Sequence, residues 1–194
     1  MRSAVRIKLL VTLGVIFVPM AAAFGYLGGT GQLHRIVDNW TVMVAVIELR
    51  QHPDNLSATI RAGQAFYGLE SYQKAADYYL QATTSSPQAD LAWNGLGNAY
   101  RELSRYEDAE MAYRQAIIIQ PQTAVYYLNL ADLYKRWPAV NSISDKEIKT
   151  TLEAGAKATD NDVALVRALV EYYTRVGDSK TADKYQKLLP AETR

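Results

Sequence analysis

The central part of the chain, residues 56–123, repeats one pattern of small, aromatic and polar positions, so that 56–89 and 90–123 are two copies of a single segment. Overlaying 56–89 on 90–123 gives eleven identical positions, and most of these hold small or aromatic residues. The identical pairs are Ala58/Ala92, Gly63/Gly97, Ala65/Ala99, Leu69/Leu103, Tyr72/Tyr106, Ala75/Ala109, Tyr79/Tyr113, Gln81/Gln115, Ala82/Ala116, Pro87/Pro121 and Gln88/Gln122. A fixed period in this range indicates supersecondary units that stack on one another.

Each of these segments predicts two helices that pack closely together. Small residues stand where the two helices would approach, and large ones such as Phe66 and Tyr79 fill the space between them. Pro87 and Pro121 end the second helix of each segment, because proline lacks a backbone N–H and clashes with the preceding turn. The pattern therefore predicts an all-α fold built from helix-turn-helix units.

The same pattern continues on both sides of the central part, with less regularity. A third unit covers 124–162, where Pro138 breaks the first helix and an insertion is expected near 137–145. A fourth, degenerate unit covers 163–194 and is expected to cap the stack. Upstream, residues 33–55 predict a capping helix followed by a turn.

The N-terminal part of the chain is apolar. Three basic residues stand in the first eight positions, and Leu9–Leu33 then contains no charged residue. This run is long enough for the roughly 20 apolar residues that span a bilayer. It predicts a transmembrane helix at about 8–28, so that 1–32 comprise a cytoplasmic stub, the helix and a glycine-rich exit.

Two other interpretations of this apolar run stay open. A signal peptide could be cleaved after Ala21-Ala22-Ala23, and a buried helix of a soluble protein is the third possibility. The basic residues before the run favour a cytoplasmic N-terminus. Both the anchor and the signal peptide would therefore place the repeats in the periplasm or outside the cell.

Composition argues against most kinds of chemistry. The chain of 194 residues has a net charge of +1, which gives no argument for nucleic acid. It has no cysteine, so it can form no disulfide, thiolate zinc site or cysteine nucleophile. Its two histidines, His34 and His52, are far apart, and no phosphate loop or catalytic serine motif is present. We therefore expect no enzymatic activity, no cofactor and no metal.

The second unit resembles the tetratricopeptide repeat, whose pattern is W-x2-L-G-x2-Y, then A-x3-F, then A and P. It fills these positions with Trp93, Leu96, Gly97, Tyr100, Ala109, Tyr113, Ala116 and Pro121. The first unit fills them with Thr59, Ala62, Gly63, Phe66, Ala75, Tyr79, Ala82 and Pro87, of which only Thr59 fits poorly. The resemblance implies a right-handed α-solenoid of three to four units, which binds other proteins and seldom performs chemistry.

In that family, the first helix of each unit lines a concave groove. The resemblance implies a peptide groove made by Gln64, Tyr67, Asn94, Asn98, Arg101, Asn129, Asp132, Lys135, Arg167 and Glu171. Amides can bond a peptide backbone, and Arg or Lys can hold carboxylates. The two-carboxylate clamp of chaperone-tail binders is not indicated. Asn98 and Asn129 match it, but Asn94, Ala164 and Ala168 stand where its basic residues belong.

These observations together predict a membrane-anchored scaffold that holds a protein or an extended peptide on the non-cytoplasmic side. One alternative is a constitutive structural subunit of a larger membrane complex. Another is a secreted or periplasmic repeat protein, released when a signal peptide is cleaved.

Overall fold

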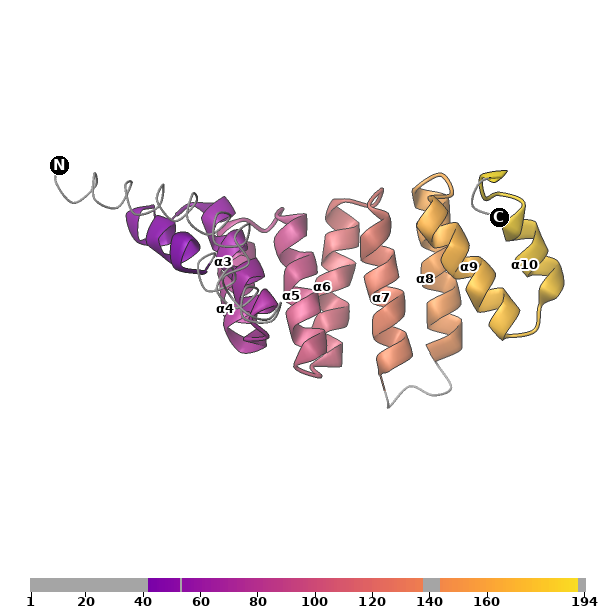
Figure 1. Ribbon diagram of the computed structural model, residues 1–194, viewed down its shortest axis with the longest axis horizontal. Coiled ribbons are helices and arrows are strands. Elements are labelled where there is room, and N and C mark those ends of the chain that lie inside the picture. The colour runs from indigo at the N-terminus through magenta and orange to yellow at the C-terminus, as the bar shows by residue number, and fades with distance from the viewer. Residues whose placement is uncertain (1–41, 53, 138–143, 192–194) are drawn as a thin grey trace, which may run out of the picture. The chain divides into compact units, whose positions relative to one another are not determined.

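The protein is all-α over the residues that the structure, a computed structural model, describes: 42–52, 54–137 and 144–191 (Figure 1). Nine helices and no strand occur in these residues. The first helix, which carries no label in Figure 1, covers 42–51. The others are α3 (Leu56–Gly68), α4 (Tyr72–Ser85), α5 (Asp90–Glu102), α6 (Tyr106–Ile119), α7 (Ala124–Arg136), α8 (Ser144–Ala158), α9 (Val163–Arg175) and α10 (Ser179–Gln186).

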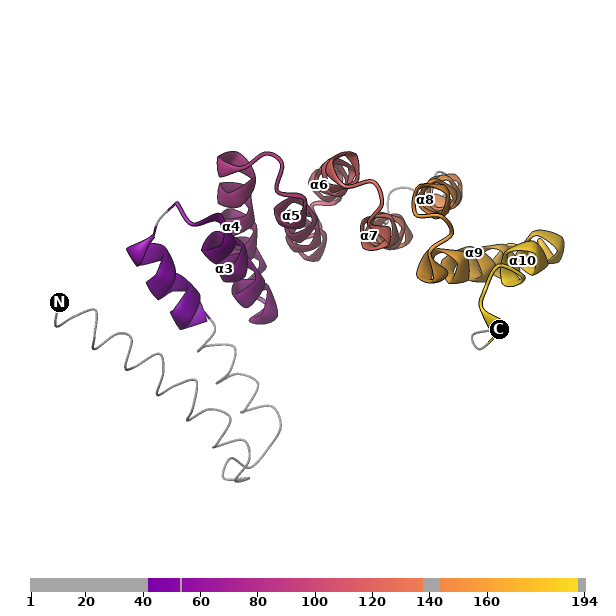
Figure 2. The ribbon, with the colours of Figure 1, turned by 90° about the horizontal axis from the view of Figure 1, so that it is seen from above.

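The chain divides into two compact units, one ending at Ser85 and the other beginning at Ser86. In the first unit, α3 packs against α4. Glu48 in the helix at 42–51 accepts a hydrogen bond from Asn55 and pairs with Arg61, so it connects that helix to α3. In the second unit, each helix from α5 to α10 packs against the next. Figure 2 shows α5, α7 and α9 on one side of this unit and α6 and α8 on the other.

Close packing inside the repeats depends on glycines that face tyrosine rings. A Cβ atom added to Gly63 would lie 2.8 Å from the ring of Tyr79, and one added to Gly97 would lie 2.7 Å from the ring of Tyr113. In the third repeat, Ala131 and Leu152 occupy the corresponding positions, and both are buried in the core. Ala131 is larger than the glycine of the other two repeats, and Leu152 is smaller than their tyrosine. The two changes compensate, because the space between two helices is limited.

The turn between the two helices of a repeat has the same backbone shape three times. Glu70, Ser104 and Gly177 have φ angles of 56°, 59° and 82°, and each occupies the same place after the start of its first helix. The residue that follows each of them donates its N–H to a carbonyl in the last turn of that helix, at 2.9 to 3.0 Å. This is the hydrogen-bond pattern of a helix that ends with a left-handed residue.

The third repeat departs from this turn for a reason that the sequence contains. Its corresponding position is Pro138, and a proline ring holds φ negative, so a left-handed residue is excluded there. Residue 138 itself lies outside the described residues. The third repeat is also longer than the second. More residues lie between the start of α7 at Ala124 and the start of α9 at Val163 than between the start of α5 at Asp90 and the start of α7. The connection from α7 to α8 is longer than the one from α5 to α6.

The predicted all-α helical repeat is confirmed for the described residues. The predicted transmembrane helix at about 8–28 lies outside them. Among the helices that the structure describes, none combines the length and the apolar character needed to cross a bilayer.

Candidate partner-binding face

Eight of the ten predicted groove residues lie in the second unit, on its first helices. Gln64 and Tyr67 belong to α3 in the first unit. The side of the second unit formed by α5, α7 and α9 is here called the first-helix face. Its predicted members are Asn94, Asn98 and Arg101 on α5, Asn129, Asp132 and Lys135 on α7, and Arg167 and Glu171 on α9.

Two polar contacts connect α5 to α7 near the N-terminal ends of both helices. The Tyr126 hydroxyl donates to Asp90 Oδ2 at 2.5 Å, and Asn129 Nδ2 donates to Asn94 Oδ1 at 2.8 Å. The amide contact uses one atom of each side chain, so Asn94 Nδ2 and Asn129 Oδ1 lie outside it. A donor and an acceptor on neighbouring helices match the N–H and C=O of an extended peptide backbone.

Two further predicted groove residues make contacts within the fold, one inside a repeat and one between repeats. Asn98 Oδ1 accepts a hydrogen bond of 2.7 Å from the hydroxyl of buried Tyr113, inside the second repeat. Arg101 pairs with Glu102 at 2.9 Å and with Asp132 at 3.4 Å, and Asp132 also pairs with Arg136 at 2.9 Å. The positive charge of Arg101 is therefore balanced within the fold.

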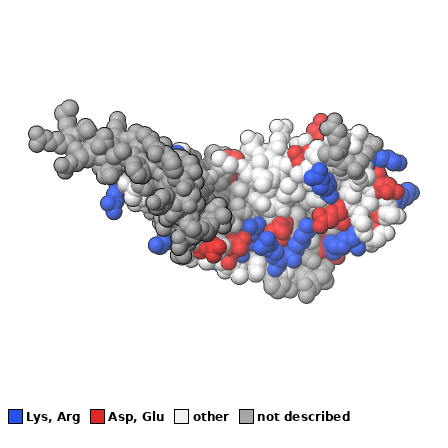
Figure 3. All heavy atoms as spheres, in the orientation of Figure 1, with Lys and Arg blue, Asp and Glu red and all other residues white. Residues whose placement is uncertain are grey.

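Uncharged side chains occupy the area above this ion-pair network. Figure 3 shows charged atoms gathered along the lower part of the visible face and a largely uncharged area above them in the middle of the molecule. Leu91 on α5 is 60% exposed, and Val125, at the equivalent position of the next repeat on α7, is 46% exposed. Two large apolar side chains at the same place in successive repeats, next to Asn94 Nδ2 and Asn129 Oδ1, form a surface suited to an extended apolar peptide.

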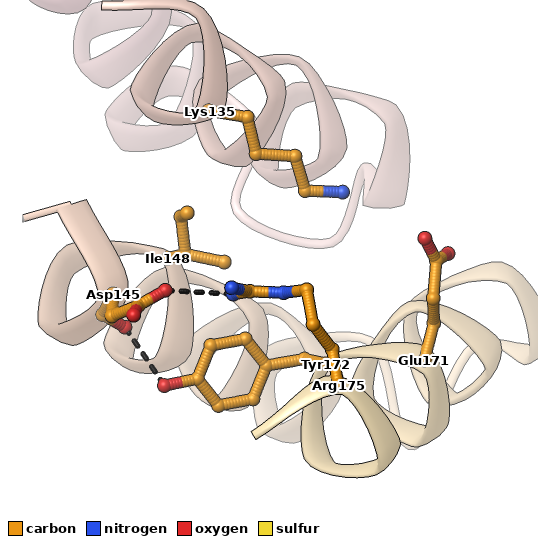
Figure 4. Close-up of a pocket in the computed structure, with 6 residues that line it drawn as sticks. All are labelled: Lys135, Asp145, Ile148, Glu171, Tyr172 and Arg175. Carbon is orange, nitrogen blue, oxygen red and sulfur yellow. Dashed lines mark hydrogen bonds and ion pairs between the residues drawn. The ribbon is translucent and has the colours of Figure 1, made fainter. Parts of the chain in front are cut away.

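A cavity of about 300 Å³ lies at the end of the face, between α7, α8 and α9 (Figure 4). Its lining residues are Lys135, Asp145, Ile148, Glu171, Tyr172 and Arg175. Arg175 pairs with Asp145 at 2.7 Å and stacks on the Tyr172 ring, whose hydroxyl donates to the Asp145 carbonyl at 3.0 Å. Lys135 and Glu171 extend toward the cavity from opposite helices, as Figure 4 shows.

The predicted groove contained only two of the six cavity residues. It missed Asp145 and Ile148, because both lie on α8, which follows the expected insertion. It also missed Tyr172 and Arg175, because they lie outside the positions used for the family's groove. The aromatic and basic pair Tyr172 and Arg175, one turn apart on one helix, is the signal that could have found them.

Several buried tyrosines are held in the neutral form. Burial raises the pKa of Tyr126 above its usual value, and the hydrogen bond to Asp90 raises it further. Burial also raises the pKa of Tyr134 and Tyr173, which donate to Glu110 at 2.7 Å and to Glu153 at 2.5 Å. The pKa of Tyr79 in the first unit is raised by burial as well.

These pKa directions predict a loss of stability in alkali. Because the folded pKa values lie above the unfolded value of about 10, the stabilisation is complete below pH ~10 and is lost as the pH rises through the folded values. We expect the midpoint of urea unfolding to fall between pH ~9 and pH ~11. The Tyr126→Phe variant should show a smaller fall of this unfolding midpoint over the same pH range. If tyrosine ultraviolet absorbance shows complete ionisation by pH ~10 while the helices remain folded, this expectation is wrong.

No group of histidine, aspartate and glutamate residues that could hold a metal ion occurs in the part of the chain that the structure describes. His52 is exposed, and His34 lies outside that part. The first-helix face offers amides, apolar side chains and one charged cavity.

The comparisons with known proteins agree with the repeat pattern. Residues 46–90 and 60–124 match the family model described as Tetratricopeptide repeat, which supports a tetratricopeptide-repeat protein. No curated protein sequence matches the chain.

Similar folds occur among solved structures. MamA is 16% identical with a TM-score of 0.64, and the alignment covers 83% of this chain and 92% of that one. TTC0263, a thermophilic TPR protein of Thermus thermophilus, is 17% identical with a TM-score of 0.59, at 79% and 82% coverage. The APC/C hetero-tetramer Cut9–Hcn1 is 18% identical with a TM-score of 0.62, and the alignment covers 76% of this chain but only 27% of that chain. At these identities the similarity shows the fold alone.

Proposed function

We propose that this tetratricopeptide-repeat protein is a non-enzymatic scaffold, and that its second unit holds an extended segment of a partner protein on the first-helix face. The observation that supports this most directly is the pair Leu91 and Val125. Both are large, apolar and exposed, and both lie beside the amide pair of Asn94 and Asn129. The amides would bond the backbone of the segment, and the apolar side chains would contact its side chains.

The cavity at the end of the face would determine which charged side chains the bound segment can have at that point. Lys135 and Glu171 face it from opposite helices, and in the described residues neither forms an ion pair with another residue. A segment with an acidic side chain near Lys135 and a basic one near Glu171 would satisfy both groups.

The proposal predicts that the double variant Leu91→Ser/Val125→Ser loses its partner. Loss of two apolar contacts should reduce recovery of co-purified protein by about tenfold or more in a pull-down with the full chain from detergent-solubilised membranes. Val176→Ser/Leu188→Ser is a matched control, because these residues are similarly exposed but lie at the C-terminal end. Equal recovery with both double variants would rule out the first-helix face as the binding site.

We further propose that residues 8–28 anchor the chain in a membrane and that the repeats lie on the non-cytoplasmic side. The uncharged run Leu9–Leu33 behind three basic residues supports this arrangement. Because the chain has no cysteine, a single Ser57→Cys change would make the repeats specifically labelable. A membrane-impermeant maleimide should label it in intact bacterial spheroplasts. A mature N-terminus at Phe24 would instead indicate a cleaved signal peptide.

A second candidate function is that of a constitutive subunit of a larger membrane complex. The exposed apolar residues of the second helices, Leu80, Met111 and Ile118, support it, since they would be covered by a permanent neighbour. Co-purification of one protein at a fixed ratio under all growth conditions would favour this function over transient scaffolding.

A further inference from the structure

The side of the second unit opposite to the first-helix face contains a trough between α6 and α8. In Figure 2, α7 is set back between these two helices and forms the floor. The trough encloses about 450 Å³. Its lining residues are Arg114, Ile117 and Ile118 of α6, Tyr127 and Leu130 of α7, and Glu147, Thr150, Thr151 and Ala154 of α8. The α8 wall follows a spacing of three and four positions, so it is one continuous helix face.

An apolar ridge runs along α6 beside this trough. Ile118 is 72% exposed and Met111 is 63% exposed, which makes them the two most exposed large apolar side chains in the described chain. Arg114 lies between them, so the three residues follow a helical spacing and lie along one side of α6. Packing inside the fold does not require apolar residues here, because this side does not face the core.

The charges of the two walls are opposite. Arg114 on the α6 wall is bonded to Glu110 at 2.8 Å and to the Tyr134 hydroxyl at 2.9 Å, and these bonds use Nε and Nη2. Its Nη1 lies outside both bonds. On the α8 wall, Glu147 forms no ion pair with another described residue. An apolar ridge beside an apolar trough, with a cation on one wall and a carboxylate on the other, is complementary to itself under a two-fold rotation.

We propose that a second copy of this chain docks in the trough. In this two-fold dimer, Ile118 of each copy enters the trough of the other near Ala154, and Arg114 of each lies opposite Glu147 of the partner subunit. The contact buries the two most exposed apolar residues and satisfies the Glu147 carboxylate. It leaves the first-helix face open, so dimerisation and binding of a partner protein are separate functions.

The absence of cysteine allows a direct test in the full chain. Two differently tagged copies, one with Ile118→Cys and the other with Ala154→Cys, are co-expressed and oxidised in membranes. We expect a disulfide-linked heterodimer that carries both tags. The control is the pair Leu91→Cys and Val125→Cys, which are also exposed but lie on the first-helix face. A heterodimer that forms equally well in the control pair overturns the proposal.

Charge reversal distinguishes this dimer from other contacts. In the crosslinking background, Arg114→Glu should reduce the yield about tenfold, because it places two carboxylates opposite each other at both ends of the interface. Adding Glu147→Arg to both copies should restore the yield to within about twofold. Thermal unfolding of each variant shows whether it remains folded. No restoration in a folded double variant, or a crosslink from Ile118→Cys to a different protein in place of a second copy, overturns the proposal.

Discussion

Gly155→Val should destabilise the second unit by about 3 kcal/mol. Gly155 lies in α8 directly against α7, and a Cβ atom added to it would lie 2.7 Å from Tyr127 Cγ and 2.8 Å from Tyr127 Cβ. These atoms are at the base of the tyrosine side chain, so no rotation of the ring removes the clash. The other end of Tyr127 is also held, because its hydroxyl donates to the Pro121 carbonyl at 3.0 Å. The helices α7 and α8 would have to separate.

The matched control is the same substitution at Gly68, the last residue of α3. A Cβ atom added there meets no heavy atom within 4 Å. Urea unfolding followed by circular dichroism should show Gly68→Val within about 0.5 kcal/mol of the unmodified chain. A Gly155→Val variant as stable as the Gly68→Val variant would show that α8 does not pack on Tyr127 in this way.

Tyr113→Ala should destabilise the second unit by about 4 kcal/mol. The Tyr113 side chain is fully buried between α5 and α6, and it is one of the largest buried side chains in the described core. Its removal leaves a cavity opposite Gly97 and removes the hydrogen bond to Asn98. Tyr113→Phe keeps the ring and removes only that hydrogen bond, so it should cost about 1 kcal/mol.

A second substitution tests whether Gly97 and Tyr113 form one packing unit. Alone, Gly97→Ala should destabilise, because its Cβ would lie 2.7 Å from the ring. In the Tyr113→Ala background, the clash is absent, and the same change should stabilise by up to about 1 kcal/mol through the higher helix propensity of alanine. If the effect of Gly97→Ala is the same in both backgrounds, the two residues are independent and the proposed packing is incorrect.

The repeat pattern could be predicted from the sequence because each of its positions meets a local structural requirement. Glycine opposite tyrosine allows close approach of two helices, and proline after the second helix ends it. The insertion expected near 137–145 also follows from a local requirement. The other repeats make a left-handed turn with Glu70, Ser104 and Gly177. Pro138 at the corresponding position cannot form this turn, since φ of proline cannot be positive.

The binding residues were harder to assign, because their roles depend on neighbours far away in the chain. Asn94 and Asn129 were expected to face a ligand, and the structure shows that they bond each other from successive repeats. Arg101 was expected to line the groove, and the structure shows that it pairs with Asp132 of the next repeat. A sequence pattern places a side chain on a helix face but does not reveal its partner on the next helix.

The sequence by itself determined the all-α repeat, the positions of its tight helix contacts and the break after Trp137, since these follow from residue size and backbone freedom. Only the tertiary structure decided which polar groups are used within the fold, because that depends on how successive repeats align. It also brought Lys135 and Glu171 to one cavity, and Arg114 and Glu147 to opposite walls of one trough. These residues come together only when separate helices pack, so no local sequence pattern reveals that they are neighbours.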